Sequence, residues 1–195
     1  RYGSAWGGYG LDDSGTLVPV FTYTTDDDGN ATITGYTGYA SALVIPSEID
    51  GHTVVGIGGS AFANREGLYS VVIPDTVTSI GSSAFSGCSN LSEVKLSNNL
   101  TSIGNWAFRN CVSISSIHVP KTLTNIDTYG WNWRYPFSGC SGLKKVSFDD
   151  DATAIPGALF GNTGLEEVIV PDTITSIGER SFAGCTNLKE LKLSK

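Results

Sequence analysis

Residues 73–88 read IPDTVTSIGSSAFSGC, and variants of this stretch recur along most of the chain. The spacing is 23 residues, so that Phe85 and Cys88 are followed by Phe108 and Cys111. Counting outward gives six copies and a partial seventh, marked by Phe62, Phe85, Phe108, Phe137, Phe160 and Phe182. A repeat of this length indicates a solenoid, because one unit cannot bury its apolar side chains without stacked neighbours.

Each copy has the pattern of one coil rather than of one strand in a globular sheet. Val71 and Ile73 point to the same side of a short strand, since side chains alternate along a strand. Ile80 and Phe85 then return inward from the opposite wall, and Gly81 marks the turn. The sequence predicts a β-dominated solenoid with coils of about 23 residues, a parallel sheet and short helical or 3₁₀ turns.

The first 40 residues do not follow the repeat. Alternation in Phe21–Thr24 and Ala31–Thr34, joined across the Asp- and Gly-containing segment 26–30, predicts a β-hairpin. The first coil of a solenoid needs a cover. We therefore interpret residues 1–40 as an N-terminal hairpin cap and lead-in, and residues 41–195 as the solenoid.

The last strand of the array contains Leu191 and Leu193, and no cap follows it in the sequence. Two interpretations stay open: the natural protein continues beyond Lys195, or a partner covers this edge. Uncovered strand edges tend to recruit another chain. We therefore expect weak self-association through the C-terminal coil.

Two strings, residues 73–88 and Ile174-Thr175-Ser176-Ile177-Gly178, resemble the BspA-like class of leucine-rich repeats, and the resemblance covers about 155 of the 195 residues. The segment from Phe21 to Tyr36 is similar to the N-terminal lead-in of that family. The resemblance implies a leucine-rich-repeat solenoid in a bacterial protein that is secreted or displayed on the cell surface. It also implies adhesion to host matrix, host cells or other bacteria, and no shared catalytic residues.

The composition excludes other functional classes. Lys and Arg number 12 against 19 Asp and Glu, the formal net charge is −7, and only 16% of residues are charged. Nucleic acid is not expected as a partner, because its phosphates require clustered cations. No apolar run approaches the roughly 20 residues of a membrane span. The sequence contains no Met, so Arg1 is interpreted as the start of a processed or trimmed chain, in line with an extracellular location.

The four cysteines occupy one repeat position, three residues after a phenylalanine: Cys88, Cys111, Cys140 and Cys185. Equivalent residues in stacked coils are about 4.8 Å apart with parallel Cα–Cβ bonds, whereas a disulfide needs Cβ atoms about 3.8 Å apart. The sequence therefore predicts buried, reduced thiols that fill the core. A zinc site is not expected, because residues in a ladder do not converge on one point.

The chain offers little for catalysis. His52 and His118 are the only histidines and lie about three coils apart by alignment, so no His-based triad or metal site is expected. The Asp runs 26–28 and 149–151 lack the Gly and bidentate Glu of a calcium loop, and Asp side chains commonly stabilise turns. We predict that the protein is not an enzyme and needs no cofactor.

The outward positions of the sheet are a second candidate ligand-binding surface, since solenoid proteins often bind their ligands there. Between the inward pairs these positions are Val44, Val72, Lys95, His118, Ser147, Ile169 and Lys192. They form a mixed strip, neither a charged trough nor an aromatic ladder. Such a strip is compatible with protein binding but does not require it.

One copy breaks the period. The isoleucine and the next phenylalanine are five residues apart in ordinary copies, such as Ile103 and Phe108, but eleven apart from Ile126 to Phe137. The six added residues must bulge outward, because both flanking coils keep their inward pattern. The insertion is rich in aromatic residues, which are enriched at binding hot spots.

We predict a ligand site for a peptide or a sugar at Trp106, Tyr129, Trp131, Trp133, Arg134 and Tyr135. The alternative is that these rings fold back as a local mini-core that shields the wider coil. Two functions stay open as well. The first is a non-catalytic binding protein that adheres through protein or glycan contacts, and the second is a recognition or spacer module of a larger secreted enzyme.

Overall fold

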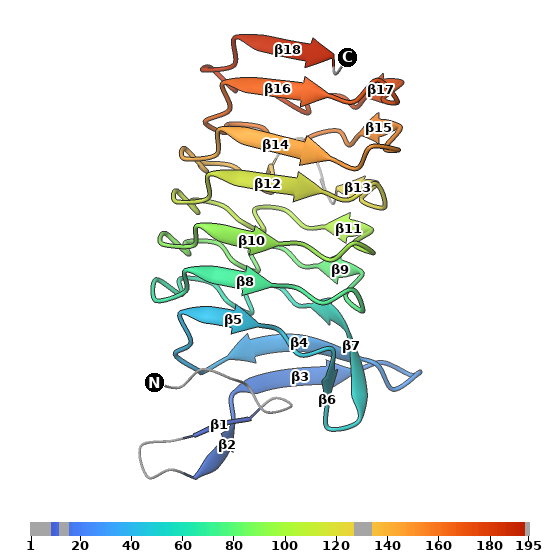
Figure 1. The fold of residues 1–195 in the computed structure, drawn as a ribbon. Helices are drawn as coiled ribbons and strands as arrows, with labels where there is room; N and C mark the ends of the chain where they lie inside the picture. The colour runs from blue at the N-terminus through green and yellow to red at the C-terminus, as the bar shows by residue number, and fades with distance from the viewer. Residues whose placement is uncertain (1–8, 12–15, 127–133, 194–195) are drawn as a thin grey trace.

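The computed structural model describes residues 9–11, 16–126 and 134–193. Within them the chain winds as stacked coils built from short strands and turns, and no described residue is helical (Figure 1). The strands β3 and β4 lie at one end of the stack and β18 lies at the other (Figure 1). The predicted solenoid is confirmed.

The first wall of the solenoid is a ladder of parallel strands with one strand from each coil (Figure 1). Its members are β5 (Ala42–Val44), β8 (Ser70–Val72), β10 (Glu93–Lys95), β12 (Ser116–Val119), β14 (Lys145–Phe148), β16 (Glu167–Val170) and β18 (Glu190–Leu193). Hydrogen bonding divides the ladder into three groups, β5-β8-β10, β12-β14 and β16-β18. Side chains alternate between core and surface along these strands, as the sequence predicts.

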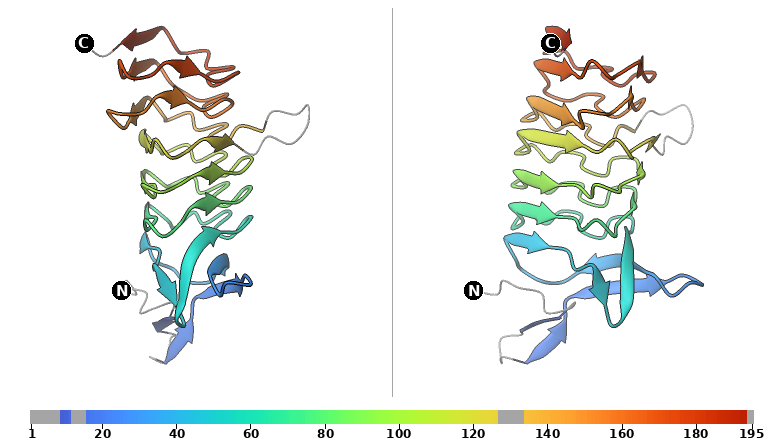
Figure 2. Two further views of the ribbon diagram at one scale, coloured as in Figure 1. Left: turned by 90° about the vertical axis from the view of Figure 1, so that its right-hand side faces the viewer. Right: turned by 45° about the vertical axis from the view of Figure 1, so that its right-hand side comes forward.

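A second wall faces the first and is also paired in parallel (Figure 2). It contains β7 (His52–Ile57), β9 (Ser79–Ile80), β11 (Ser102–Ile103), β13 (Asn125–Ile126), β15 (Ala154–Ile155) and β17 (Ser176–Ile177). The strands β7, β9, β11 and β13 form one continuous sheet, whereas β15 and β17 form a separate pair. The break follows β13, where the chain enters the insertion. The returning isoleucines therefore lie in a ladder of their own.

The N-terminal hairpin caps the first coil. Strands β3 (Phe21–Thr25) and β4 (Ala31–Tyr36) pair antiparallel, and β4 pairs parallel with β7 of the second wall. Asp26 stabilises the connecting turn, because its Oδ1 accepts the backbone N–H groups of Asp28 at 3.1 Å and Asn30 at 2.8 Å. Three further short strands belong to this end: β6 (Glu48–Ile49) pairs with β7, and β1 (Tyr9–Leu11) pairs with β2 (Leu17–Pro19).

A column of stacked phenylalanine rings fills the interior between the walls. Successive ring centroids are 4.9 to 5.1 Å apart from Phe62 to Phe137, with interplanar angles of 5° or less. The angle rises to 28° between Phe137 and Phe160. In the Phe160 copy, the next leucine follows after five residues instead of the six that separate Phe137 from Leu143. This shortening lies between Phe160 and Phe182, whose rings are again close to parallel with an interplanar angle of 11°, so it does not account for the 28° angle.

The four thiols are buried and not bonded to one another. Each Sγ donates to the carbonyl oxygen of the phenylalanine in a preceding coil, for example from Cys88 to Phe62 at 3.1 Å and from Cys140 to Phe108 at 3.0 Å. Burial raises the pKa of the Cys140 thiol to about 12. The prediction of buried, reduced core thiols is confirmed.

The segment that carries the phenylalanine forms turns instead of the expected helical or 3₁₀ turn. Within one coil the Ala84 N–H donates to the Gly81 carbonyl at 3.3 Å, but the next N–H, from Phe85, donates to Ala107 in the following coil at 2.7 Å. A 3₁₀ helix needs successive bonds inside the segment. Alternate bonds to the neighbouring coil prevent it.

Candidate functional site

Trp106 marks the described part of the predicted ligand site. It follows β11 on the second wall and has a φ of +57°. The repeat places Ser83, Tyr135 and Ala158 at the same position in other coils. The Trp106 N–H donates to the Arg134 carbonyl at 3.1 Å, which brings the end of the insertion against the preceding coil. Its side chain is half-buried.

Two arginines contact the Trp106 indole. The guanidinium carbon of Arg134 lies 4.4 Å from the ring centroid, and that of Arg109 lies 4.6 Å from it. Both arginines are exposed. A guanidinium over an indole is attracted by the ring quadrupole and is held in a defined orientation. The structure therefore gathers one aromatic and two cationic side chains at the base of the insertion.

Arg109, which lies three residues after Trp106, was not among the predicted site residues. The signal was present, because the same repeat position holds only Ala63, Ser86, Ser138, Gly161 and Ala183 in the other copies. An arginine at a position otherwise occupied by small residues indicates a local function rather than a requirement of the fold.

Tyr135 has a different environment from the two arginines. Its side chain is only 7% exposed. A Cβ added to Gly161 would lie 2.3 Å from the Tyr135 ring, so this ring covers Gly161 of the next coil. Tyr135 therefore packs into the solenoid, as the mini-core alternative expects. Tyr129, Trp131 and Trp133 lie outside the described residues, and their assignment to the site stays a prediction.

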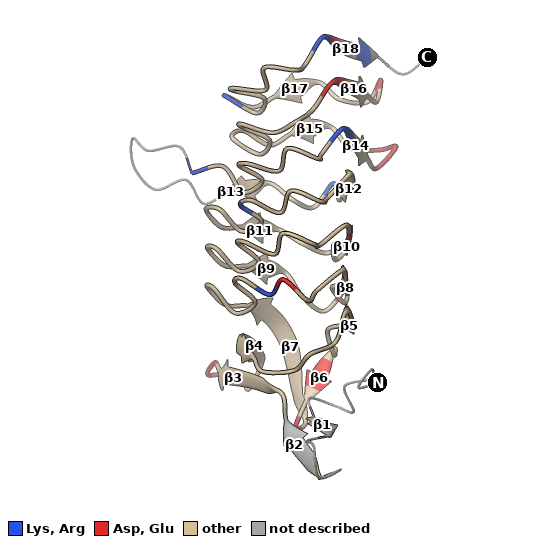
Figure 3. Cartoon of the chain, turned by 90° about the vertical axis from the view of Figure 1, so that its left-hand side faces the viewer, with Lys and Arg blue, Asp and Glu red and all other residues tan. Residues whose placement is uncertain are grey.

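The outward strip of the first wall lies in the register that the repeat predicts. Val44 pairs with Val72 and Val72 with Lys95, while His118 pairs with Ser147 and Ile169 with Lys192. Charged residues are scattered along the chain rather than gathered in one trough (Figure 3). Opposite charges also neutralise each other, as between Lys144 and Glu166 at 2.8 Å. The strip offers a mixed surface.

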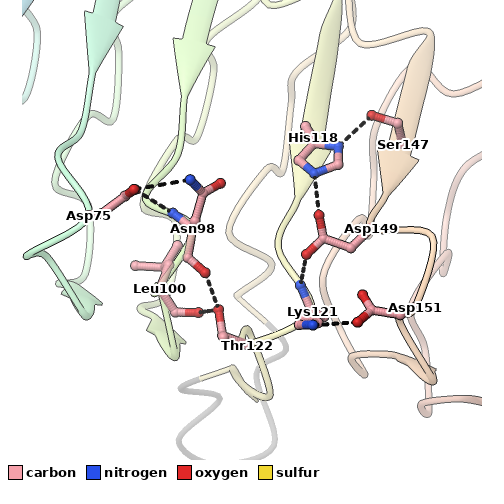
Figure 4. A network of polar contacts seen from close by, with 9 residues as sticks. All are labelled: Asp75, Asn98, Leu100, His118, Lys121, Thr122, Ser147, Asp149 and Asp151. Carbon is pink, nitrogen blue, oxygen red and sulfur yellow. Dashed lines mark hydrogen bonds and ion pairs between the residues drawn. The ribbon is translucent and has the colours of Figure 1, made fainter.

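A polar network on this wall involves His118 (Figure 4). The two ring nitrogens contact Ser147 Oγ and Asp149 Oδ1, each at 2.9 Å. The second Asp149 oxygen accepts the Lys121 backbone N–H at 2.8 Å, and Lys121 Nζ pairs with Asp151. These contacts lower the pKa of the Asp149 carboxyl, chiefly through the Lys121 N–H. The Asp run 149–151 thus connects two coils, and its carboxylates stabilise more than a single turn.

Ser147 and Asp149 contact the His118 ring, an arrangement of Ser, His and Asp that the spacing of the two histidines did not predict. Acyl transfer by a Ser-His-Asp triad requires more than these hydrogen bonds. Backbone N–H groups must also converge on the reacting carbonyl. Ser147 lies within strand β14, where the backbone pairs with β12. We interpret the network as a cross-link between the coils that flank the insertion.

A similar cross-link lies two coils earlier, between the coils of β8 and β10. Asp75 accepts the backbone N–H of Asn98 at 2.9 Å and the side-chain amide of the same residue at 3.1 Å (Figure 4).

Among the described residues, no group of three or more His, Cys, Asp or Glu side chains is arranged to hold a metal ion. The part of the chain that the structure describes also has no helix that is long and apolar enough to cross a membrane.

The two ladders and the periodic core define a leucine-rich-repeat solenoid, a class that generally serves protein–protein interaction without catalysis. The chain belongs to the BspA-type leucine-rich repeat family, whose model, described as "BspA type Leucine rich repeat region", matches residues 55–189 in six copies. The family that the sequence resembles is therefore confirmed. No curated protein matches the chain significantly.

Solved structures of bacterial proteins are similar to this chain. The T. pallidum leucine-rich repeat protein is 30% identical with a TM-score of 0.69, over 89% of this chain and 79% of that protein. A leucine-rich repeat protein from Bacteroides capillosus is 31% identical with a TM-score of 0.58, over 69% of this chain and 97% of its own. A leucine-rich cell surface protein from Faecalibacterium prausnitzii is 29% identical with a TM-score of 0.56, over 89% of this chain and 53% of its own.

Proposed function

We propose that this chain is a non-catalytic, secreted or cell-surface binding protein of a bacterium that adheres to host matrix, host cells or other bacteria. The single observation that carries the proposal is the cluster of Trp106, Arg109 and Arg134 at the base of the insertion. The repeat itself does not require these side chains, because one coil earlier Ser83 and Ser86 occupy the positions of Trp106 and Arg109, and Asn105 occupies the position of Arg134.

The family supports the extracellular location. A similar structure, 29% identical, is that of a protein described as a cell surface protein. The low content of charged residues, 16%, also agrees with an extracellular surface. Leucine-rich repeats bind other proteins through extended surfaces, so protein contacts are proposed as the principal mode and glycan contacts as the second.

The experiment measures adhesion of the purified chain to immobilised host matrix proteins and to cultured host cells. Trp131→Ala and Trp133→Ala are expected to weaken adhesion while the melting temperature stays nearly unchanged. Trp106→Ser introduces the residue found at position 83, so that the fold tolerates it, and is expected to weaken adhesion as well.

The matched control is Tyr69→Ala, which removes an aromatic side chain that is 54% exposed and lies just before β8 of the first wall. If the insertion variants lower the melting temperature strongly and leave adhesion intact, the aromatic residues are a mini-core.

The alternative function, a module of a larger secreted enzyme, is decided by the full reading frame. A catalytic domain beyond Lys195 would support that alternative.

A further inference from the structure

The two arginines at Trp106 have no acidic partner among the described residues. The described ion pairs formed by other cationic side chains involve His118, Lys121, Lys144, Arg180 and Lys192. Within residues 9–11, 16–126 and 134–193, the only contact found for the Arg109 and Arg134 side chains is with the indole. In the part of the chain that the structure describes, no acidic side chain pairs with these two positive charges, although the net charge of the chain is −7.

The repeat positions equivalent to the two arginines are neutral in the adjacent coils. The position of Arg109 is occupied by Ser86 and Ser138 in the adjacent coils, and that of Arg134 by Asn105 and Gly157. Small neutral residues neither repel an approaching anion nor block it. These repeat positions therefore place no opposing charge beside the two arginines.

The indole prepares both guanidinium groups for binding. Stacking uses the face of a guanidinium and leaves the N–H donors around its edge available for a carboxylate. Because each group lies within 4.6 Å of the same ring centroid, their central carbons are no more than about 9 Å apart. A stacked side chain has already lost much of its freedom, so a ligand meets a smaller entropy cost.

We propose that Arg109 and Arg134 bind an acidic protein segment that presents carboxylates at alternate residues of an extended strand. Such carboxylates lie on one side of the strand, roughly 6.6 Å apart, which is within the upper limit of about 9 Å between the two guanidinium carbons. The inference rests on the proposed binding function and names the chemistry of its partner. A sugar is disfavoured, because the Trp106 ring is half-buried and already covered by guanidinium groups.

The test uses a seven-residue peptide with Glu at its third and fifth positions, and a control peptide with Gln at both. Binding is followed by NMR through the Arg Nε–H signals and the Trp106 indole N–H signal. Arg109→Ser and Arg134→Ser are each expected to weaken binding of the Glu peptide roughly tenfold, as for loss of one charge-assisted pair. Added salt should weaken binding to the wild-type chain.

The matched control is Arg180→Ser, which removes the same charge from an arginine that pairs with Glu179 and is expected to leave binding unchanged. Both test variants introduce a residue that the repeat already contains at that position, at Ser86 and Ser82. Their melting temperatures are measured alongside to show that they fold.

Equal binding of the Glu and Gln peptides, no binding of either, or insensitivity to both arginine variants would overturn the inference. So would stronger binding of a sulfated oligosaccharide at the same signals. The adhesion assay separates this failure from failure of the proposed function. If the chain adheres and both arginine variants adhere equally well, only the inference fails; if the wild-type chain does not adhere to any target, the proposed function fails.

Discussion

The side-chain oxygen of Asn64 lies 2.2 Å from the place where a Cβ on Gly87 would be. Both residues have positive φ, +59° for Asn64 and +77° for Gly87. The same relationship joins Asn110 to Gly139 and Asn162 to Gly184, at 2.2 and 2.1 Å. Asn and Gly are the residues that tolerate this conformation. The asparagine amide fills the space that the next glycine leaves, so the two types alternate from coil to coil.

Gly87→Ala is expected to destabilise the solenoid by about 1–2 kcal/mol from the left-handed backbone alone, and more if Asn64 cannot turn away. In a domain of this size this corresponds to a fall in the melting temperature of several degrees. Combining Gly87→Ala with Asn64→Gly removes the overlap and should recover part of the loss, which a double-mutant cycle measures.

Gly67→Ala is the control for this pair. No atom lies within 4 Å of a Cβ at Gly67, and its φ is not positive, so the melting temperature should stay nearly unchanged. If Gly67→Ala and Gly87→Ala lower the melting temperature equally, the packing of Asn64 over Gly87 does not contribute to the stability of the solenoid.

Phe108→Ala is expected to cost about 3–5 kcal/mol of unfolding free energy, as for other buried aromatic truncations. Phe108 is fully buried and stacks on Phe85 and Phe137 at 5.0 and 5.1 Å, so a cavity would open between two coils. Urea unfolding measures the change. Tyr69→Ala, at a side chain that is 54% exposed, should change it by less than about 0.5 kcal/mol. Similar losses of unfolding free energy for Phe108→Ala and Tyr69→Ala would contradict the interpretation that the stacked phenylalanine rings form the core.

The four thiols are expected to react slowly with a thiol reagent in the folded state. Only the thiolate is reactive. All four thiols are buried, which shields them from the reagent. Contact with Cys88 and burial raise the pKa of the Cys111 thiol, and burial raises that of Cys140 to about 12, whereas contact with Cys111 lowers the pKa of Cys88. All four thiols should titrate rapidly once denaturant is added without a reducing agent. Fewer than four after unfolding would show that a disulfide exists.

Asp149→Asn is expected to lower the melting temperature at neutral pH. The Lys121 N–H and then His118 hold the pKa of Asp149 below its ordinary value of 3.8. A lowered folded-state pKa contributes stability above the unfolded value, and that stability is lost as pH falls through the folded value. The difference from wild type should therefore shrink below about pH 3.

Asp150→Asn is the control, because no side-chain contact of Asp150 is found among the described residues. Its melting temperature should follow that of the wild-type chain across the same pH range. If the melting temperatures of Asp149→Asn and the wild-type chain differ by the same amount from pH 7 to pH 2, the charge of the Asp149 carboxylate does not contribute to stability.

Weak self-association is expected through β18, which among the described strands pairs with β16 alone. Leu191, at an inward position of this strand, is 48% exposed. Leu191→Glu should reduce association in sedimentation experiments, because a charge at an apolar contact must be desolvated. Val44→Glu, at an outward apolar side chain that is 65% exposed, should have no effect. A strict monomer at high concentration would rule the contact out.

The sequence by itself determined the coil. The spacing of Ile80 and Phe85, repeated every 23 residues, forces the same inward pattern on each copy, because only stacked copies bury these side chains. It also determined the hairpin at β3 and β4 and the thiol ladder. These features depend on periodicity and on short-range turn chemistry, both of which can be seen in a linear string. The excess of six residues after Ile126 is visible in the same way.

Only the tertiary structure decided which side chains of different coils touch. The alignment places Ser147 beside His118, but the hydrogen bond between them and the contact with Asp149 depend on side-chain rotamers. Arg109 and Arg134 meet on Trp106 because the chain returns from the insertion in register with the preceding coil. Periodicity specifies the backbone path of a solenoid, whereas surface contacts between coils depend on side chains that the repeat leaves free to vary.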